Sequence, residues 1–287
     1  MSQPEMALDR VMTEIAAITG FSAHQYRPTT LKRRLELRFG ATLSRNCQDY
    51  LDYLKKDPSE GYRFLDALFI TVTDFFRDRA VFSYLEKEIL PGLIEEVSAK
   101  NKNKLSVWSI GCSQGQESYS LAMILDRLRR GKKKRLTISI LATDVSAMSL
   151  NLARHALYKR AEMKNIPRKY QHEFFKKMDD DSFRLIDRVR TMVKFKQHNL
   201  IQESSFGKFD LVSCRNMLIF LRTGAQNEML RKLHSSLKKR GVLVLGTAET
   251  PKEEGLFQCI SSTHHVFRKV PAVSTIRNHS KERKNAA

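Results

Sequence analysis

The stretch LSVWSIGCSQGQESYSLAMILDRL, residues 105–128, decides the fold of this chain. It opens with an apolar run, Leu105 to Ile110, which is typical of a buried strand. A loop containing Gly111 and Gly115 follows, and apolar residues then recur at helical spacing up to residue 128. A strand, a glycine loop and a helix in this order are typical of the first unit of a doubly wound α/β sheet, where ligands bind beyond the carboxyl ends of the strands. We therefore expect Gly111 to let the backbone approach a ligand closely.

The next strand narrows the class of ligand. Residues 136–142 form a β-branched apolar run that ends at Thr143 and Asp144. An acid at the tip of the second strand is where the ribose of a nucleotide is usually held. The loop lacks both the dinucleotide glycine fingerprint and a Walker lysine. Together these features favour an adenosine cofactor without a pyrophosphate, such as S-adenosylmethionine. The loop taken alone also fits an ordinary strand-to-helix turn.

Length and composition limit the number of domains, the location and the class of partner. The 287 residues suit one large α/β domain with a small companion, and we expect a cytoplasmic protein because no signal pattern or long apolar run occurs. The four cysteines lack metal-ligand spacing, so we expect reduced thiols and no metal site. A formal net charge of +20 favours an acidic partner, which could be nucleic acid, an anionic surface or an acidic protein.

The first 68 residues are predicted to form a small helical domain. After Pro28, Leu31, Leu35 and Phe39 recur every four residues, as on one face of a helix. The cations of this helix are Lys32, Arg33, Arg34 and Arg38. A solvated basic face and a docking surface for an acidic partner are both compatible with this pattern.

Residues 69–93 are predicted to form a flap and a linker helix, with a break at Pro91 and Gly92. Thr71, Thr73 and Arg77 place two hydroxyls and a cation just before the cofactor domain, which suits a flap over its site, although a surface cation beside core aromatics is the plainer alternative.

The cofactor domain is expected to span residues 94–270. Within it, residues 158–198 break the α/β rhythm and predict an inserted subdomain, with short antiparallel strands at residues 183–186 and 192–195. Residues 265–268 are expected to close the sheet as its final edge strand. The basic segment 271–287 lacks apolar periodicity and is expected to be disordered.

Five motifs in order resemble the chemoreceptor glutamate methyltransferases, the CheR family. They are TDFFRD at residues 73–78, the glycine loop and helix at 108–123, ATD at 142–144, NL at 199–200 and FDLVSCRNMLIF at 209–220. The resemblance extends to about Val270. It implies a Rossmann-like S-adenosylmethionine-dependent methyltransferase sheet with a small N-terminal all-helical domain and a small inserted antiparallel β-subdomain.

The resemblance also implies an activity: formation of glutamyl methyl esters on the cytoplasmic helical bundle of chemoreceptors, with S-adenosylhomocysteine as the second product. The expected cofactor residues are Thr71, Thr73, Arg77, Gly111, Glu117, Asp144, Asn199, Leu200, Arg215 and Asn216. Arg77 is expected to orient the incoming carboxylate as well. The basic helix carrying Lys32, Arg33, Arg34 and Arg38 is expected to steer the acidic receptor bundle.

Two departures from the family pattern bear on function. Relatives commonly have a tyrosine facing the substrate carboxylate where this chain has Phe220, so Phe220 marks the catalytic position without its hydroxyl. This predicts a slower enzyme or, as the alternative, a cofactor-binding regulatory module without turnover. Relatives that dock onto a receptor's C-terminal tether carry a glycine-containing insertion, whereas residues 179–182 contain no glycine, so tether docking is not expected.

A nucleic-acid methyltransferase is the remaining alternative, suggested by the net charge. The aromatic residues are not interleaved with the basic runs as a base-stacking platform requires. A glutamate side chain, with a pKa of roughly 4.3, is already an anion at neutral pH and needs no general base. The absence of recurring His–Cys or Ser–His pairs from the motifs agrees with a carboxylate substrate.

Overall fold

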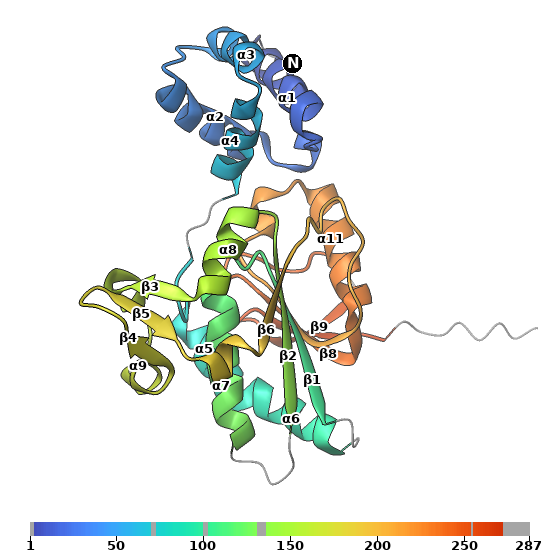
Figure 1. The fold of residues 1–287 in the computed structure, drawn as a ribbon. Coiled ribbons are helices and arrows are strands. Elements are labelled where there is room, and N and C mark those ends of the chain that lie inside the picture. Colours follow the sequence, from blue (N-terminus) through green and yellow to red (C-terminus); the bar gives the residue numbers. More distant parts are fainter. Residues whose placement is uncertain (1–2, 70–72, 100–102, 131–135, 254, 272–287) are drawn as a thin grey trace, which may run out of the picture.

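A computed structural model describes residues 3–69, 73–99, 103–130, 136–253 and 255–271. The described chain forms a helical unit, a large mixed sheet with helices on both faces and a small antiparallel sheet at one side (Figure 1). This arrangement confirms the fold class expected from the sequence. Thr71 and the tail from residue 272 onward lie outside the described residues. None of the described helices is both long and apolar enough to cross a membrane.

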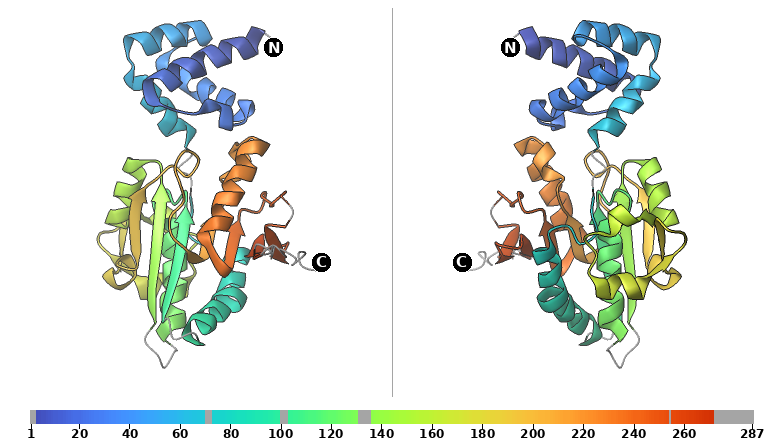
Figure 2. Two further views of the ribbon diagram at one scale, coloured as in Figure 1. Left: turned by 90° about the vertical axis from the view of Figure 1, so that its right-hand side faces the viewer. Right: turned by 90° about the vertical axis from the view of Figure 1, so that its left-hand side faces the viewer.

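Four helices make up the N-terminal unit, which lies beyond the carboxyl ends of the parallel strands (Figure 2). They are α1 (Gln3–Thr19), α2 (Pro28–Thr42), α3 (Cys47–Lys56) and α4 (Ser59–Leu68). Pro28 occupies the first turn of α2, where its missing N–H costs no helical hydrogen bond. Leu31 and Leu35 of α2 are buried in the same core cluster as Tyr50 and Phe64, as their spacing predicts.

The large sheet has the order β6-β2-β1-β7-β8-β10-β9. Its strands are β1 (Lys104–Ile110), β2 (Thr137–Asp144), β6 (Val193–Gln197), β7 (Phe209–Cys214), β8 (Leu237–Leu245), β9 (Phe257–Ser261) and β10 (Val266–Lys269). The first five strands in this order run parallel. β10 pairs antiparallel with both β8 and β9, so β9 runs in the same direction as the first five strands. The chain proceeds outward from β1 through β2 to β6 and then returns to β7 on the other side of β1. This reversal makes the carboxyl ends of β1 and β7 the point where ligands bind in such sheets.

Helices cover both faces of the large sheet. Val107 of β1 packs in the same core cluster as α6 (Leu90–Ala99) and α7 (Gln116–Arg130), while the adjacent Trp108 packs in the cluster that contains α11 (Thr223–Ser236). Successive side chains of a strand point to opposite faces, so a strand buried on both faces reads as a continuous apolar run. The helix α8 (Ala147–His155) follows β2.

The inserted region is smaller than predicted. An antiparallel sheet of β3 (Leu157–Lys159), β5 (Ser182–Leu185) and β4 (Phe175–Lys177) forms it, with α9 (Arg168–Phe174) between β3 and β4. The prediction of an antiparallel strand at residues 192–195 is wrong, because β6 pairs parallel with β2. The short α10 (Asp187–Arg190) separates β5 from β6.

Two further boundaries differ from expectation. β10 lies between β8 and β9, so the edge strand on this side is β9 and not residues 265–268. The linker helix does not break at Pro91: α5 (Arg79–Tyr84), a π-helical turn (Leu85–Ile89) and α6 follow one another without interruption. The π-helical turn ends at Ile89, and Pro91 is the second residue of α6, so the chain stays helical through the proline.

Candidate cofactor site

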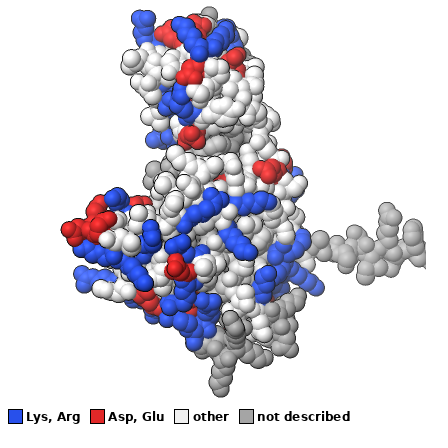
Figure 3. All heavy atoms as spheres, viewed as in Figure 1, with Lys and Arg blue, Asp and Glu red and all other residues white. Residues whose placement is uncertain are grey.

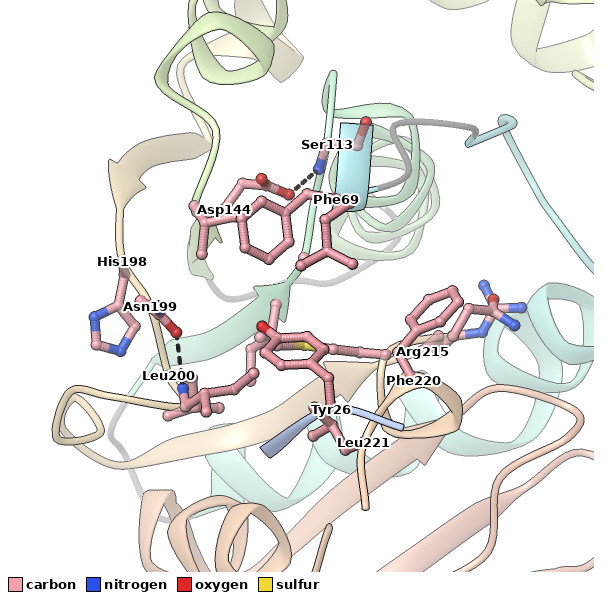
Figure 4. A pocket seen from close by; sticks show the side chains of 17 residues that line it. Tyr26, Phe69, Ser113, Asp144, His198, Asn199, Leu200, Arg215, Phe220 and Leu221 are labelled. Atoms are coloured by element: carbon pink, nitrogen blue, oxygen red, sulfur yellow. Dashed lines mark hydrogen bonds between the residues drawn. The ribbon is translucent and has the colours of Figure 1, made fainter. Parts of the chain in front are cut away.

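A pocket opens where the carboxyl ends of β1, β2 and β7 meet the N-terminal helical unit (Figure 4). The ends of the strands of the large sheet and the loops that follow them supply most of the lining. These residues are Ile110, Gly111, Ser113, Asp144, Val145, His198, Asn199, Leu200, Ile201, Arg215, Asn216, Met217, Phe220 and Leu221. The helical unit and its connection supply Tyr26, Leu68 and Phe69. The pocket therefore has walls from both parts of the chain.

The glycine loop between β1 and α7 forms the floor of this pocket. Gly111 has a φ of +64° and Gly115 a φ of +91°, in the region that side chains with a Cβ rarely adopt. A Cβ on Gly115 would lie 3.2 Å from Ala153 and 3.2 Å from Phe195. The backbone nitrogen of Cys112 donates to the carbonyl of Thr143 at 3.0 Å, which joins the loop to the end of β2.

Asp144 stands at the end of β2 with its carboxylate fixed by backbone donors. One oxygen accepts from the nitrogen of Ser113 at 2.8 Å, and the other accepts from the nitrogen of Ser146 at 3.0 Å. Burial raises the pKa of Asp144 above its ordinary value, although these hydrogen bonds oppose the shift. The carboxylate is thus held rigidly beside the glycine loop, with acceptor capacity left for ligand hydroxyls.

An apolar wall lies next to Asp144. Leu200 and Ile201 are buried, and both line the pocket with Val145. The side-chain oxygen of Asn199 accepts from the nitrogen of Ile201 at 3.1 Å, which fixes the turn after β6. His198 also lines the pocket, and its ring packs on Phe206 with centroids 4.3 Å apart. Such a wall suits a flat, weakly polar ring such as adenine.

Arg215, at the end of β7, contacts the segment that contains Arg77 and Asp78. Its side chain is 1% exposed and donates to Asp78 at 2.6 Å and to Glu117 at 3.3 Å. It also donates to the backbone carbonyl of Arg77 at 3.0 Å. Glu117 accepts a further hydrogen bond from Ser109. Two carboxylates therefore hold the one guanidinium of Arg215 in place at this end of the pocket.

Glu249 supports the pocket wall, although it is not among the predicted site residues. It is 3% exposed, and its carboxylate accepts from the backbone nitrogens of Gly246, Asn216 and Ile219 at 2.7, 2.8 and 3.2 Å. It therefore holds the loop after β7 that carries part of the pocket wall. An acid three residues after the glycine that follows an apolar strand is the signal that the sequence offers.

The predicted site residues fall into three groups. Those that line the pocket are Gly111, Asp144, Asn199, Leu200, Arg215, Asn216 and Phe220. Thr73, Arg77 and Glu117 are half-buried and do not line it, although Glu117 and the backbone of Arg77 contact Arg215. Thr71 lies outside the described residues. Sequence reasoning missed Tyr26, Leu68 and Phe69 as lining residues.

The four predicted docking cations of α2 do not share one environment. Lys32 and Arg33 are exposed and Arg34 is half-buried. Burial, with a smaller contribution from Arg33, lowers the pKa of Arg34. Arg38 differs, because its guanidinium donates two hydrogen bonds to the fully buried Glu60 at 2.7 and 2.8 Å. The structure therefore assigns Arg38 to the core of the helical unit.

S-adenosylmethionine fits the residues present. The carboxylate of Asp144 is placed to accept from ribose hydroxyls, and the wall at Leu200 suits an adenine ring. The amino-acid end of the cofactor carries an ammonium and a carboxylate, and the acids Asp78 and Glu117 together with Arg215 offer groups of both signs to it. Within the described residues, no group of three or more His, Cys, Asp and Glu side chains is placed to hold a metal ion.

Comparison with known proteins identifies the family. The model described as CheR methyltransferase, SAM binding domain, matches residues 71–266, and the model described as CheR methyltransferase, all-alpha domain, matches residues 6–69. A chemotaxis protein methyltransferase of Borreliella burgdorferi is 30% identical over 85% of this chain and 87% of its own length.

Two other relatives extend the comparison. A chemotaxis protein methyltransferase of Listeria monocytogenes is 31% identical over 83% of this chain and 88% of its own length. An uncharacterized 104.1 kDa protein of Rhodobacter capsulatus is 30% identical over 93% of this chain but only 28% of its own length. The matched models, the order of the sheet and the pocket at its switch point agree, and the chain belongs to the CheR methyltransferase family.

Proposed function

We propose that this protein transfers the methyl group of S-adenosylmethionine to glutamate side chains on the cytoplasmic helical bundle of a chemoreceptor, forming glutamyl methyl esters. One observation carries the proposal: the chain of this methyltransferase family brings Gly111, Asp144, Leu200 and Arg215 to one pocket. Relatives named chemotaxis protein methyltransferase support the chemotaxis setting. A receptor substrate of this kind places the protein in the cytoplasm.

Each part of the pocket has a role in this proposal. Asp144 holds the ribose hydroxyls, the wall at Leu200 and Asn199 holds the adenine, and Gly111 allows close backbone approach. We assign the amino-acid end to Arg215, which lines the pocket and is held in place by Glu117 and Asp78 behind it. When bound, the cofactor supplies an electrophilic methyl group on a sulfonium. S-adenosylhomocysteine is the product left behind.

The chemistry requires alignment more than proton transfer. A glutamate substrate is an anion at neutral pH, so no residue has to remove a proton from it. Opposite charges on carboxylate and sulfonium diminish together as the methyl group moves, and a site poor in water favours that change. Ile110, Met217 and Phe220 give this side of the pocket an apolar lining. We propose that Arg77 orients the incoming carboxylate by a charge-assisted contact.

The docking surface is proposed to be α2. Lys32 and Arg33 are exposed, and Arg34 is half-buried beside them. Lys and Arg side chains gather on the N-terminal helical unit and on the face of the large domain below it (Figure 3). Cations at this position attract an acidic receptor bundle toward the domain that carries the pocket. Arg38 is left out of the surface because Glu60 engages it.

The proposed partner is the receptor bundle alone, without a C-terminal tether. The turn between β4 and β5 is closed by Asp179, whose carboxylate accepts from the nitrogens of Asp181 and Ser182 at 2.9 and 2.7 Å. This compact turn contains no glycine insertion of the kind found in tether-docking relatives.

A second candidate follows from Phe220. Its ring lines the pocket but offers no hydroxyl to a substrate carboxylate. A cofactor-binding regulatory module that no longer turns over has the same pocket and the same family membership.

Transfer of label distinguishes the two candidates. The protein is incubated with methyl-labelled S-adenosylmethionine and a receptor cytoplasmic fragment, beside a Phe220→Tyr variant. Label on the fragment that mild base releases as methanol supports glutamyl esterification. If neither protein transfers label to any of several receptor fragments while both bind the cofactor, the regulatory module replaces the enzyme.

A further inference from the structure

The N-terminal helical unit contributes directly to the pocket, and its contribution is aromatic. Tyr26, Leu68 and Phe69 line the pocket from this side, and the rings of Tyr26 and Phe69 lie 6.5 Å apart. Of these three residues, Tyr26 has the only polar side chain. A tyrosine brought to the cofactor pocket from a separate domain is a candidate ligand contact.

The backbone around Tyr26 is fixed to the far wall of the pocket by a reciprocal pair of arginines. The nitrogen of Arg27 donates to the carbonyl of Phe220 at 2.9 Å, and the nitrogen of Arg222 donates to the carbonyl of Gln25 at 2.9 Å. The side chain of Arg27 donates to the carbonyl of Leu221, and that of Arg222 donates to the carbonyl of Tyr26. Tyr26 and Leu221 thereby form an isolated antiparallel bridge.

The Tyr26 ring is also held in place by packing. It is 5% exposed and contacts Phe21, with ring centroids 5.0 Å apart. The hydroxyl forms no hydrogen bond with any residue that the structure describes, and burial alone raises its pKa. The group is therefore protonated at neutral pH and available as a donor. A fixed donor in a largely apolar pocket has little ordering cost when a ligand arrives.

The direction of the hydroxyl indicates which part of the ligand it meets. In Figure 4 the oxygen of Tyr26 points toward the side of Asn199 and Leu200, and Arg215 lies on the opposite side of the ring. We propose that the Tyr26 hydroxyl donates a hydrogen bond to the adenosine half of S-adenosylmethionine, so that the N-terminal domain is part of the cofactor site. This inference rests on the proposed function, because it takes the cofactor to be S-adenosylmethionine.

The matched test removes one oxygen atom. Tyr26→Phe keeps the ring and its packing, whereas Tyr62→Phe removes a hydroxyl from the same domain on an exposed residue. Affinity for S-adenosylhomocysteine is measured by isothermal titration calorimetry on the full chain, and the melting temperature without ligand is recorded in parallel. We expect Tyr26→Phe to bind about 3- to 10-fold more weakly with an unchanged melting temperature. Tyr62→Phe is expected to bind as the unsubstituted protein does.

A shorter ligand tests the assignment to the adenosine half. 5′-Methylthioadenosine lacks the amino-acid end, and Tyr26→Phe is expected to weaken its binding by the same factor. Equal affinity of Tyr26→Phe and the unsubstituted protein for S-adenosylhomocysteine would overturn the inference and leave the proposed function standing. A loss seen with S-adenosylhomocysteine but not with 5′-methylthioadenosine would overturn the assignment to adenosine. If the unsubstituted protein binds neither ligand, the proposed function and the inference both fail.

Discussion

The carboxylate of Glu249 accepts a hydrogen bond from the backbone nitrogen of Asn216 at 2.8 Å, although the two residues follow different strands. Asn216 has a φ of 58°, in the left-handed region that non-glycine residues rarely adopt. The same carboxylate oxygen accepts from the nitrogen of Gly246 at 2.7 Å. Asn216 lines the pocket, so a residue outside the lining maintains the backbone conformation of the cofactor site.

Replacing Glu249 with glutamine is therefore expected to damage both stability and binding. The amide keeps the shape of the side chain but places N–H groups against backbone donors, which leaves buried groups unsatisfied at a cost of about 1–3 kcal/mol. Urea denaturation should show this loss, and titration calorimetry should show weaker binding of S-adenosylhomocysteine. Glu228→Gln on α11 is the control, because the Glu228 side chain is more than half exposed and pairs with Lys232 on the same helix. Unchanged binding in Glu249→Gln would contradict the role given to this carboxylate.

A larger side chain at Gly246 tests how tightly the same loop is packed. A Cβ at this position would lie 2.8 Å from the backbone nitrogen of Asn216 and 2.8 Å from the carboxylate of Glu249. Because a backbone atom cannot rotate away, Gly246→Ala is expected to lower the free energy of unfolding by about 1–3 kcal/mol. Gly224→Ala serves as the matched control. Gly224 lies in α11, and a Cβ added there would meet no described group within 4 Å apart from its own helix. That control should leave the free energy of unfolding within about 0.5 kcal/mol of the unsubstituted protein, because Gly224 is exposed in the first turn of α11.

Asp144 connects cofactor affinity to pH. Burial raises its pKa, so as the pH falls this carboxylate takes up its proton at a higher pH than an ordinary aspartate. Protonation removes acceptor capacity for the ribose hydroxyls, and affinity for S-adenosylhomocysteine is expected to weaken as the pH is lowered into that range. Asp144→Asn should bind about 10- to 100-fold more weakly at neutral pH. Its affinity should also lose most of this acid-side dependence when calorimetry is repeated across pH.

Substitutions should show that the buried pair of Arg38 and the exposed Arg33 on α2 have different effects on stability and on substrate binding. Arg38→Ala leaves Glu60 buried without its main partner and is expected to cost about 3–5 kcal/mol. Arg33→Ala changes an exposed side chain and should leave stability within about 0.5 kcal/mol while raising the KM for a receptor fragment. Thermal denaturation and initial-rate kinetics measure the two effects. Equal destabilisation by both substitutions would contradict the different roles of the two arginines.

Glu60 gives the same network a pH dependence of known sign. Burial raises its pKa, but hydrogen bonds from Arg38, Tyr50 and Arg63 outweigh burial and leave the pKa below its ordinary value. A carboxylate with a lowered pKa in the folded protein stabilises it fully above the ordinary value of 4.5, and this contribution is lost as the pH falls through the lowered pKa. Glu60→Gln should therefore flatten the acid limb of the stability profile measured by urea denaturation.

The sequence predicted the centre of the site because its motifs coincide with strand ends. Gly111 and Arg215 directly follow strands of the large sheet and Asp144 ends one, and parallel strands bring their carboxyl ends to one edge. The order of the apolar runs along the chain was thus enough to bring these residues together. Their roles toward a ligand remain predictions that the variants above address.

Residues contributed from a distance were not predictable in this way. Tyr26 reaches the pocket through a bridge to Leu221, and no periodicity records a contact between positions so far apart in the chain. The pairing of Arg38 with Glu60 is not predictable for the same reason. The sequence pattern of a cation beside an apolar stripe is the same whether the cation faces solvent or a buried acid. The sequence places residues 192–195 in the wrong sheet, because alternation identifies a strand but not its partner.

The measurement that tests the central claim most directly is the chemical location of the transferred methyl group. A receptor cytoplasmic fragment is incubated with S-adenosylmethionine and either the unsubstituted protein or Phe220→Tyr, and its peptides are analysed by tandem mass spectrometry. We predict the added mass of one methylene group on glutamate side chains, removed by mild base, with Phe220→Tyr about 10- to 100-fold faster. A base-stable methyl group on a lysine or arginine nitrogen, or no transfer by either protein while both bind the cofactor, would contradict the account.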